Sequence, residues 1–187
     1  AKPGVELLVC LKASNINIKE VTVTSLRAND RSPVAFTNIS KESVAKANLG
    51  QDIPYLLLQT PSLVASSDAG TGIGYTGFRI RGTDASRINV TINGIPYNDA
   101  DEQGAYWVDI PDFASSVENI QVQRGVGTTT NGAAAFGANI NIQSSNSSPK
   151  PAGEAAITYG SFNTRKMTLK LSSGLLKEHW ALDARLS

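Results

Sequence analysis

The stretch that decides the fold runs from residue 78 to residue 143 and carries two similar segments. The first reads FRIRGTDASRINVTINGIPYND (78–99) and the second reads ENIQVQRGVGTTTNGAAAFGANINIQ (118–143). Each opens with alternating apolar and polar residues and then reaches Arg-Gly, at Arg81-Gly82 and at Arg124-Gly125. Alternation with a period of two predicts a half-buried β-strand. A glycine directly after the arginine lets the chain turn with a positive φ.

The faces of these two strands follow from the alternation. Ile120 and Val122 point to one side of the second strand, whereas Gln121 and Gln123 point to the other. Between the strands, Asn93-Gly94 with alternating flanks is the strongest short-range signal for a β-hairpin.

The surrounding residues predict the remaining elements of one domain. We expect a strand over 34–39, a helix over 41–48 capped by Ser40, and a short helix after the N-cap Asp52. Further strands are expected at 77–81, 87–92, 117–123 and 138–143, with loops at 66–76 and 98–104. These elements predict a compact α+β domain with a mixed sheet over residues 34–144.

Four pieces of this stretch, in this order and spacing, resemble the plug domain of TonB-dependent outer-membrane receptors, in a Bacteroidetes-like form. The pieces are 78–82, the hairpin at 92–94, 118–125, and the small-residue run from Gly132 through Gly137 to Ile142. Val126 stands where the family usually has proline, and Ala138 stands where it usually has a second glycine. Both departures loosen the match without contradicting the fold.

The resemblance implies an α+β plug with a small mixed sheet and short helices, followed by the first antiparallel strands of a transmembrane β-barrel. Residues 1–13 would then be the last strand of an upstream domain, 14–33 the Ton-box segment and linker, and 34–145 the plug. Residues 146–152 would form a linker, and 153–187 the first barrel strands. On the residues alone, the alternation after Gly153 fits an antiparallel soluble hairpin as well as a membrane barrel. Since position 1 is Ala and the only methionine is Met167, we expect an internal piece of a longer precursor.

Composition excludes several classes of function. The chain has 17 basic and 16 acidic residues, which gives no support to nucleic-acid binding. Acidic residues gather in 84–118, either as a solvated face or as a site that attracts cations. A single cysteine, Cys10, permits neither an internal disulfide nor a thiolate zinc cage, and no stretch approaches the ~20 apolar residues of a membrane helix.

Enzymatic signals are weak, and we expect no catalytic residues, no metal and no cofactor. The only histidine, His179, has no nucleophile motif near it. Asp99, Asp101 and Glu102 lie in a loop where carboxylates are usually solvated, and calcium-loop spacing is absent. The run Gly72–Gly77 matches G-x-G-x-x-G, but a loop precedes it and a strand follows it, so a flexible surface loop is the better interpretation.

A β-branched segment ahead of the domain is either an edge strand or linker, or a strand that adds to a partner's sheet. The resemblance implies that it is a Ton box that binds a TonB-like energy-transducing protein. Its residues are Lys19, Glu20, Val21, Thr22, Val23 and Thr24.

The resemblance also implies further site residues. The loops 66–76 and 98–107 would face a small-molecule ligand through Tyr75, Tyr97, Glu102, Gln103, Tyr106 and Trp107, although Tyr106 and Trp107 would equally suit packing beneath their own loop. The plug's structural motif would comprise Arg79, Arg81, Gly82, Glu118, Arg124 and Gly125. Glu118 and Arg124 would meet the barrel wall.

The implied function is energy-driven import of a scarce ligand, such as a siderophore (an iron chelate), haem or a cobalamin-like compound, across the outer membrane of a Gram-negative bacterium. The alternative is a soluble, secreted α+β binding or adhesion domain.

Overall fold

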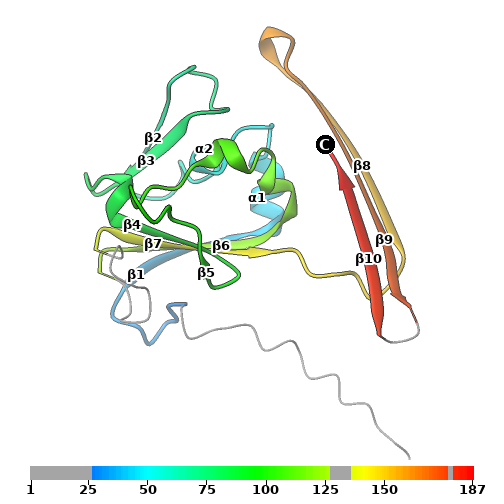
Figure 1. Cartoon of the computed structure of the whole chain (residues 1–187), viewed down its shortest axis with the longest axis horizontal. Coiled ribbons are helices and arrows are strands. Elements are labelled where there is room, and N and C mark those ends of the chain that lie inside the picture. Colours follow the sequence, from blue (N-terminus) through cyan, green and yellow to red (C-terminus); the bar gives the residue numbers. More distant parts are fainter. Residues whose placement is uncertain (1–26, 127–135, 177–178) are drawn as a thin grey trace, which may run out of the picture.

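The chain forms an α+β domain and a separate three-stranded sheet that stands beside it (Figure 1). The structure is a computed structural model and describes residues 27–126, 136–176 and 179–187. The α+β domain contains a five-stranded sheet with the helices packed on it. The separate three-stranded sheet is the C-terminal sheet.

The five-stranded sheet is mixed. Its strands lie in the order β1 (Ala35–Ser40), β6 (Val117–Arg124), β7 (Ala138–Ser144), β4 (Ile88–Ile92) and β5 (Ile95–Pro96). Neighbouring strands are antiparallel except β4 and β7, which run parallel with Ile88 opposite Ala138. The α+β domain with a mixed sheet that the sequence predicts is confirmed.

One face of this sheet carries the hydrophobic core. Two short helices, α1 (Lys41–Ala47) and α2 (Ile53–Leu56), lie over that face together with the hairpin of β2 (Leu63–Ser67) and β3 (Thr76–Ile80) (Figure 1). In the described part of the domain, 3-10 turns lie at Ala85–Arg87, Trp107–Asp109 and Phe113–Ser116. The apolar side chains that the sheet buries in this core include Ile88, Val90, Ile120, Val122, Ala138, Ile140 and Ile142.

Two local predictions are confirmed by backbone geometry. Ser40 caps α1, since its hydroxyl accepts a hydrogen bond from the N–H of Ser43 at 3.4 Å. Asn93 and Gly94 have φ values of 52° and 82° and join β4 to β5, as a type I′ hairpin turn requires.

The second face of the sheet is also buried, so the prediction of half-buried strands is wrong for its centre. The side chains on this face are polar and nevertheless shielded from water: Asn89, Thr91, Gln121, Gln123, Asn139 and Asn141. Thr91 Oγ1 donates to Asn141 Oδ1 at 2.7 Å, and Gln123 Nε2 donates to Gln121 Oε1 at 2.9 Å. Such hydrogen bonds allow polar residues to leave solvent. In the described part of the chain, Nδ2 of Asn89 and both polar side-chain atoms of Asn139 nevertheless have no hydrogen-bond partner.

The expected loop over 66–76 is shorter than predicted. Its ends are paired strand residues, because Ser67 lies opposite Thr76 and Ser66 opposite Gly77. The loop proper covers residues 68–75, at the tip of the β2–β3 hairpin.

The C-terminal sheet is antiparallel, with the order β8 (Ala152–Tyr159), β9 (Arg165–Leu176) and β10 (Trp180–Leu186). Cross-strand partners show that one face carries exposed apolar side chains, namely Ile157, Tyr159, Met167, Leu169, Leu171 and Leu186. The other face carries Glu154, Lys166, Thr168, Lys170, Asp183 and Arg185. Among the helices that the structure describes, none has the length and apolar character needed to cross a membrane.

Candidate functional site

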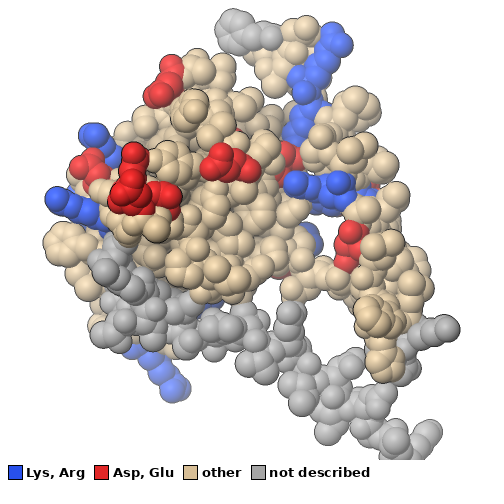
Figure 2. All heavy atoms as spheres, viewed as in Figure 1, with Lys and Arg blue, Asp and Glu red and all other residues tan. Residues whose placement is uncertain are grey.

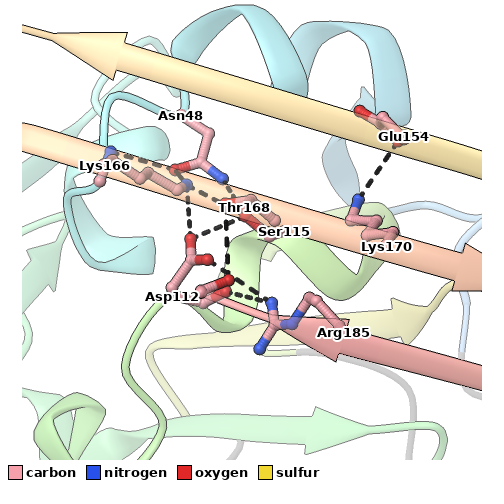
Figure 3. A network of polar contacts seen from close by, with 10 residues as sticks. Asn48, Asp112, Ser115, Glu154, Lys166, Thr168, Lys170 and Arg185 are labelled. Atoms are coloured by element: carbon pink, nitrogen blue, oxygen red, sulfur yellow. Dashed lines mark hydrogen bonds and ion pairs between the residues drawn. The ribbon is translucent and has the colours of Figure 1, made fainter.

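The α+β domain and the C-terminal sheet are joined by a polar network centred on Asp112 (Figure 3). Asp112 precedes the 3-10 turn at 113–116 and has a positive φ of 51°. Its Oδ1 lies 2.5 Å from Nζ of Lys166 on β9 and accepts a hydrogen bond from Ser115 Oγ at 2.7 Å. Its Oδ2 lies 3.7 Å from Nη1 of Arg185 on β10.

Lys166 is fully engaged by the domain. Its ammonium group donates to Asn48 Oδ1 at 2.9 Å and to Ser115 Oγ at 3.0 Å, besides its pairing with Asp112. These partners account for the three donors of an ammonium group. Arg185 also donates to the backbone carbonyl of Asp112 at 2.6 Å. Two strands of the C-terminal sheet are therefore tied to the same turn.

The environment of Asp112 favours its ionised form. Burial by itself would raise the pKa of this carboxyl group. Hydrogen bonds from Lys166, Ser187 and Ser115, with the charge of Lys166, outweigh burial and hold the pKa of Asp112 below its ordinary value. The carboxylate is thus charged at neutral pH.

Two charged residues expected to meet a barrel wall, Glu118 and Arg124, lie on β6 of the five-stranded sheet. Glu118 pairs with Lys41 at 2.9 Å within the α+β domain, and both side chains are largely exposed. Arg124 is half-buried at the end of β6, and in the described part of the chain its Nε has no hydrogen-bond partner. Asp112, Lys166 and Arg185, which the sequence did not single out, join the α+β domain to the C-terminal sheet. No local sequence signal identifies them, because the pairs join residues far apart in the chain.

The structure brings the two Arg-Gly strand ends together. A Cβ at Gly125 would lie only 3.1 Å from Nη1 of Arg81, so the guanidinium of the first motif passes beside the glycine of the second. Arg81 itself adopts a positive φ of 52°, as does Gly82 at 77°, so the turn begins at the arginine. Arg79 points away and pairs with Asp84 at 3.2 Å on the surface.

The loop of residues 98–107 is held by its own side chains. Asp99 Oδ2 accepts from the N–H groups of Asp101 and Glu102, each at 2.9 Å, and these bonds lower the pKa of Asp99. The phenol of Tyr106 donates to the carboxylate of Glu102, which raises the pKa of Tyr106 to about 12. The hydroxyl of Tyr97 donates to the carbonyl of Tyr106 at 2.6 Å.

Most of the residues predicted to face a ligand lie at the surface, but Trp107 does not. Tyr75, Glu102, Gln103 and Tyr106 are exposed, and Tyr97 is half-buried.

Trp107 is 2% exposed, with its ring centroid 5.9 Å from that of Phe78 and 6.0 Å from that of Tyr97. The 3-10 turn that begins at Trp107 directs the indole into the core. Its assignment to a ligand-facing surface is therefore wrong.

Residues 27 and 28 bind the polar side of the sheet. The backbone N–H of Ala28 donates to Gln121 Oε1 at 2.7 Å, and Gln121 Nε2 donates to the Ala28 carbonyl at 2.9 Å. Arg27 donates to Gln143 Oε1 at 2.6 Å and to Asn119. The predicted Ton box, residues 19–24, lies outside the described residues.

Charges of both signs lie on the surface. Figure 2 shows acidic side chains on the α+β domain, and basic side chains at the edges of that domain as well as at its junction with the C-terminal sheet. Within the described ranges, no group of three or more His, Cys, Asp and Glu side chains is arranged to hold a metal ion.

The family model of the TonB-dependent receptor plug domain matches residues 28–139, the segment that contains β1 to β6, both helices and the first two residues of β7. The chain belongs to this family. The plug domain with its mixed sheet and short helices is thereby shown, and the resemblance drawn from the Arg-Gly strand ends is confirmed. A comparison with curated protein sequences gives no significant match.

Solved receptors share the fold of this chain over about four fifths of its length. The Pseudomonas aeruginosa receptor FpvA, bound to a heterologous pyoverdine and iron, is 21% identical, with a TM-score of 0.63 over 79% of this chain and 19% of that one. The ferric yersiniabactin uptake receptor FyuA of Yersinia pestis is 17% identical, with a TM-score of 0.60 over 77% and 22%.

The alcaligin outer-membrane receptor FauA of Bordetella pertussis is 14% identical, with a TM-score of 0.64 over 83% and 26%. This chain thus spans about a fifth to a quarter of the length of these receptors.

Proposed function

We propose that this plug gates TonB-dependent import of a scarce small molecule across the outer membrane of a Gram-negative bacterium. The ligand class is a siderophore, haem or a cobalamin-like compound, and the protein acts as a receptor and transporter rather than as an enzyme. The observation that carries the proposal is the orientation of the C-terminal sheet relative to the plug. Its charged face binds the plug through Lys166 and Arg185, and its apolar face points away.

That orientation suits the wall of a barrel with the plug in its lumen. A membrane barrel presents apolar residues to lipid and polar residues to its interior on alternate positions of each strand. A barrel wide enough for a bulky ligand leaves an aqueous lumen, which a separate folded domain must close. In this arrangement β8–β10 are the first strands of the wall, and the network around Asp112 is one of the points where the plug meets it.

The two ends of the plug have different partners in this proposal. Tyr75, Tyr97, Glu102, Gln103 and Tyr106 belong to the loops that face the ligand, and the segment Lys19–Thr24 is the Ton box, which faces the periplasm and adds a strand to a TonB-like protein. Ligand binding on one side must bias release of the Ton box on the other, so the two sites are linked by a coupling free energy.

Strand addition is tested by removing one backbone donor from the Ton box. Val21→Pro in the intact receptor eliminates the N–H of residue 21, whereas Val21→Thr keeps that N–H and a β-branched side chain. Uptake is measured with a probe panel of radiolabelled ferric hydroxamate and ferric catecholate siderophores, haem and cobalamin. Binding of the same panel is measured without energy.

We expect Val21→Pro to abolish uptake of the panel member that the wild-type receptor transports, with binding to that probe unchanged, and Val21→Thr to retain uptake. Full uptake by Val21→Pro would refute the Ton-box assignment. A wild-type receptor that binds and imports none of the panel would refute the proposed ligand class.

A further inference from the structure

The glycine-rich run Gly72–Gly77 is held in place by one buried carboxylate, that of Asp52. Asp52 is only 7% exposed. Its Oδ2 accepts hydrogen bonds from the N–H of Gly74 at 3.0 Å and from Thr76 Oγ1 at 2.8 Å. Its own N–H donates to the carbonyl of Gly72 at 2.8 Å. A single residue thus binds three residues of the run that the sequence predicts to be a flexible surface loop.

The loop backbone lies directly against the start of α2. A Cβ at Gly72 would lie 2.8 Å from Nε2 of Gln51 and 3.0 Å from Cγ of Tyr55, and the φ of Gly72 is +79°. Gln51 Nε2 also donates to the carbonyl of Thr71 at 3.2 Å. Only glycine fits this close approach, so the loop is packed on the helix as well as hydrogen-bonded to it.

The side chain of Asp52 serves the loop and not the helix that follows it. Asp52 occupies the N-cap position of α2, yet it makes no capping hydrogen bond from its side chain. A capping aspartate normally accepts from the second or third N–H of its helix. The sequence therefore predicted the position of this residue correctly and its role wrongly.

The hydrogen bonds of Asp52 leave two side chains on the outer side of the loop. Gly72 is buried and Gly74 and Thr76 are half-buried toward Asp52, whereas Ile73 is 45% exposed and Tyr75 is 68% exposed. Alternate residues thus face the helix and the surroundings. An aliphatic group and a phenol side by side suit a ligand with both apolar surface and a hydrogen-bond acceptor.

We propose that Asp52 is a positioning residue that presets this loop and presents Ile73 and Tyr75 to the imported ligand. The inference rests on the proposed function for the identity of what Tyr75 meets, but the preset loop is a property of the plug itself. Fixing a loop before binding raises affinity because less conformational entropy is lost on association.

The loop is tested by hydrogen–deuterium exchange on the intact receptor in detergent micelles. Asp52→Ala removes both acceptor contacts, Asp52→Asn keeps one acceptor oxygen at nearly equal volume, and Asp68→Asn alters an exposed carboxylate of the same loop as the control. We expect exchange in residues 72–76 to quicken by about tenfold in Asp52→Ala, less in Asp52→Asn, and not at all in Asp68→Asn. Unchanged protection in a folded Asp52→Ala variant would overturn the proposal.

Presentation to the ligand is tested with the same probe panel of ferric siderophores, haem and cobalamin. For the member that the wild-type receptor binds, we expect the Kd to rise about tenfold in Asp52→Ala and less in Asp52→Asn. It should stay constant in Asp30→Asn, which alters an exposed carboxylate outside the ligand-facing loops. Faster exchange with an unchanged Kd would overturn the positioning role and leave the receptor function standing. If the wild-type receptor binds no member, the proposed ligand class fails, and the exchange measurement alone decides whether Asp52 presets the loop.

Discussion

Nζ of Lys166 lies 2.5 Å from Oδ1 of Asp112, so the second strand of the C-terminal sheet is bound to a turn of the plug by a shielded ion pair. Each side chain is only 15% exposed, which limits screening by solvent. A shielded charge that loses its partner is costly, because its desolvation is no longer compensated. The ion pair therefore favours one position of the plug relative to the C-terminal sheet.

Neutralising Asp112 should weaken the attachment of the plug to the C-terminal sheet. In Asp112→Asn, Lys166 and Arg185 lose their carboxylate, and we expect a loss of about 2 kcal/mol in the free energy of plug unfolding or release, as for hydrogen bonds to charged groups. Guanidinium titration of the intact receptor, followed by the fluorescence of buried Trp107, measures it. The control is Glu118→Gln, which breaks the exposed pair with Lys41 and should cost less than about 1 kcal/mol. Equal effects of the two substitutions would contradict the special role of Asp112.

The same contact should depend on pH in a defined direction. The pKa of Asp112 is lowered in the folded protein, chiefly by the hydrogen bond from Lys166 against the opposing effect of burial. The contribution of the ionised Asp112 to the free energy of unfolding is therefore fully present above the ordinary carboxyl pKa of 3.8. It is lost as the pH falls through the lower pKa that Asp112 has in the folded protein. We expect the stability difference between wild type and Asp112→Asn to be constant from neutral pH down to about pH 5 and to shrink below pH 4. A difference that vanished already near neutral pH would contradict a lowered pKa.

Gln121 should hold the start of the plug to its sheet. Gln121→Ala removes both hydrogen bonds to the backbone of Ala28 and those with Asn38 and Gln123, so the N–H and the carbonyl of Ala28 lose this partner. We expect a loss of about 1–3 kcal/mol in plug stability and faster exchange of the Ala28 amide. Gln59→Ala, at an exposed glutamine, is the control and should change neither quantity. Unaltered exchange at Ala28 would show that Gln121 does not secure this segment.

Trp107 and Tyr106 are adjacent but should behave differently. Trp107→Ala opens a cavity between Phe78 and Tyr97 and should cost about 3–5 kcal/mol of plug stability. Tyr106→Ala removes an exposed ring and its bond to Glu102, and the plug should remain folded at nearly wild-type stability. Denaturant titration of both variants measures the loss of plug stability in each. A stable Trp107→Ala variant with weakened binding of the probe panel would return Trp107 to the ligand surface.

The sequence by itself determined the elements whose causes are local. Alternation of apolar residues located β6 and β7, Ser40 located the start of α1, and Asn93-Gly94 located the turn between β4 and β5. A strand period, a cap and a hairpin turn each depend on neighbours within a few residues. The local sequence therefore specifies them without any tertiary contact.

Tertiary structure alone decided what covers each element and which distant charges meet. Gln121 alternates with apolar neighbours as a solvent-facing residue would, yet it is buried because Ala28 and Gln123 supply its hydrogen bonds. Asp52 holds the position of a helix cap, yet it binds a loop more than twenty residues further along. Asp112 and Lys166 pair only because the chain returns β9 to the plug. The physical reason is the same in each case: desolvation and charge pairing depend on spatial neighbours, and sequence periodicity carries no information about residues that fold in from elsewhere.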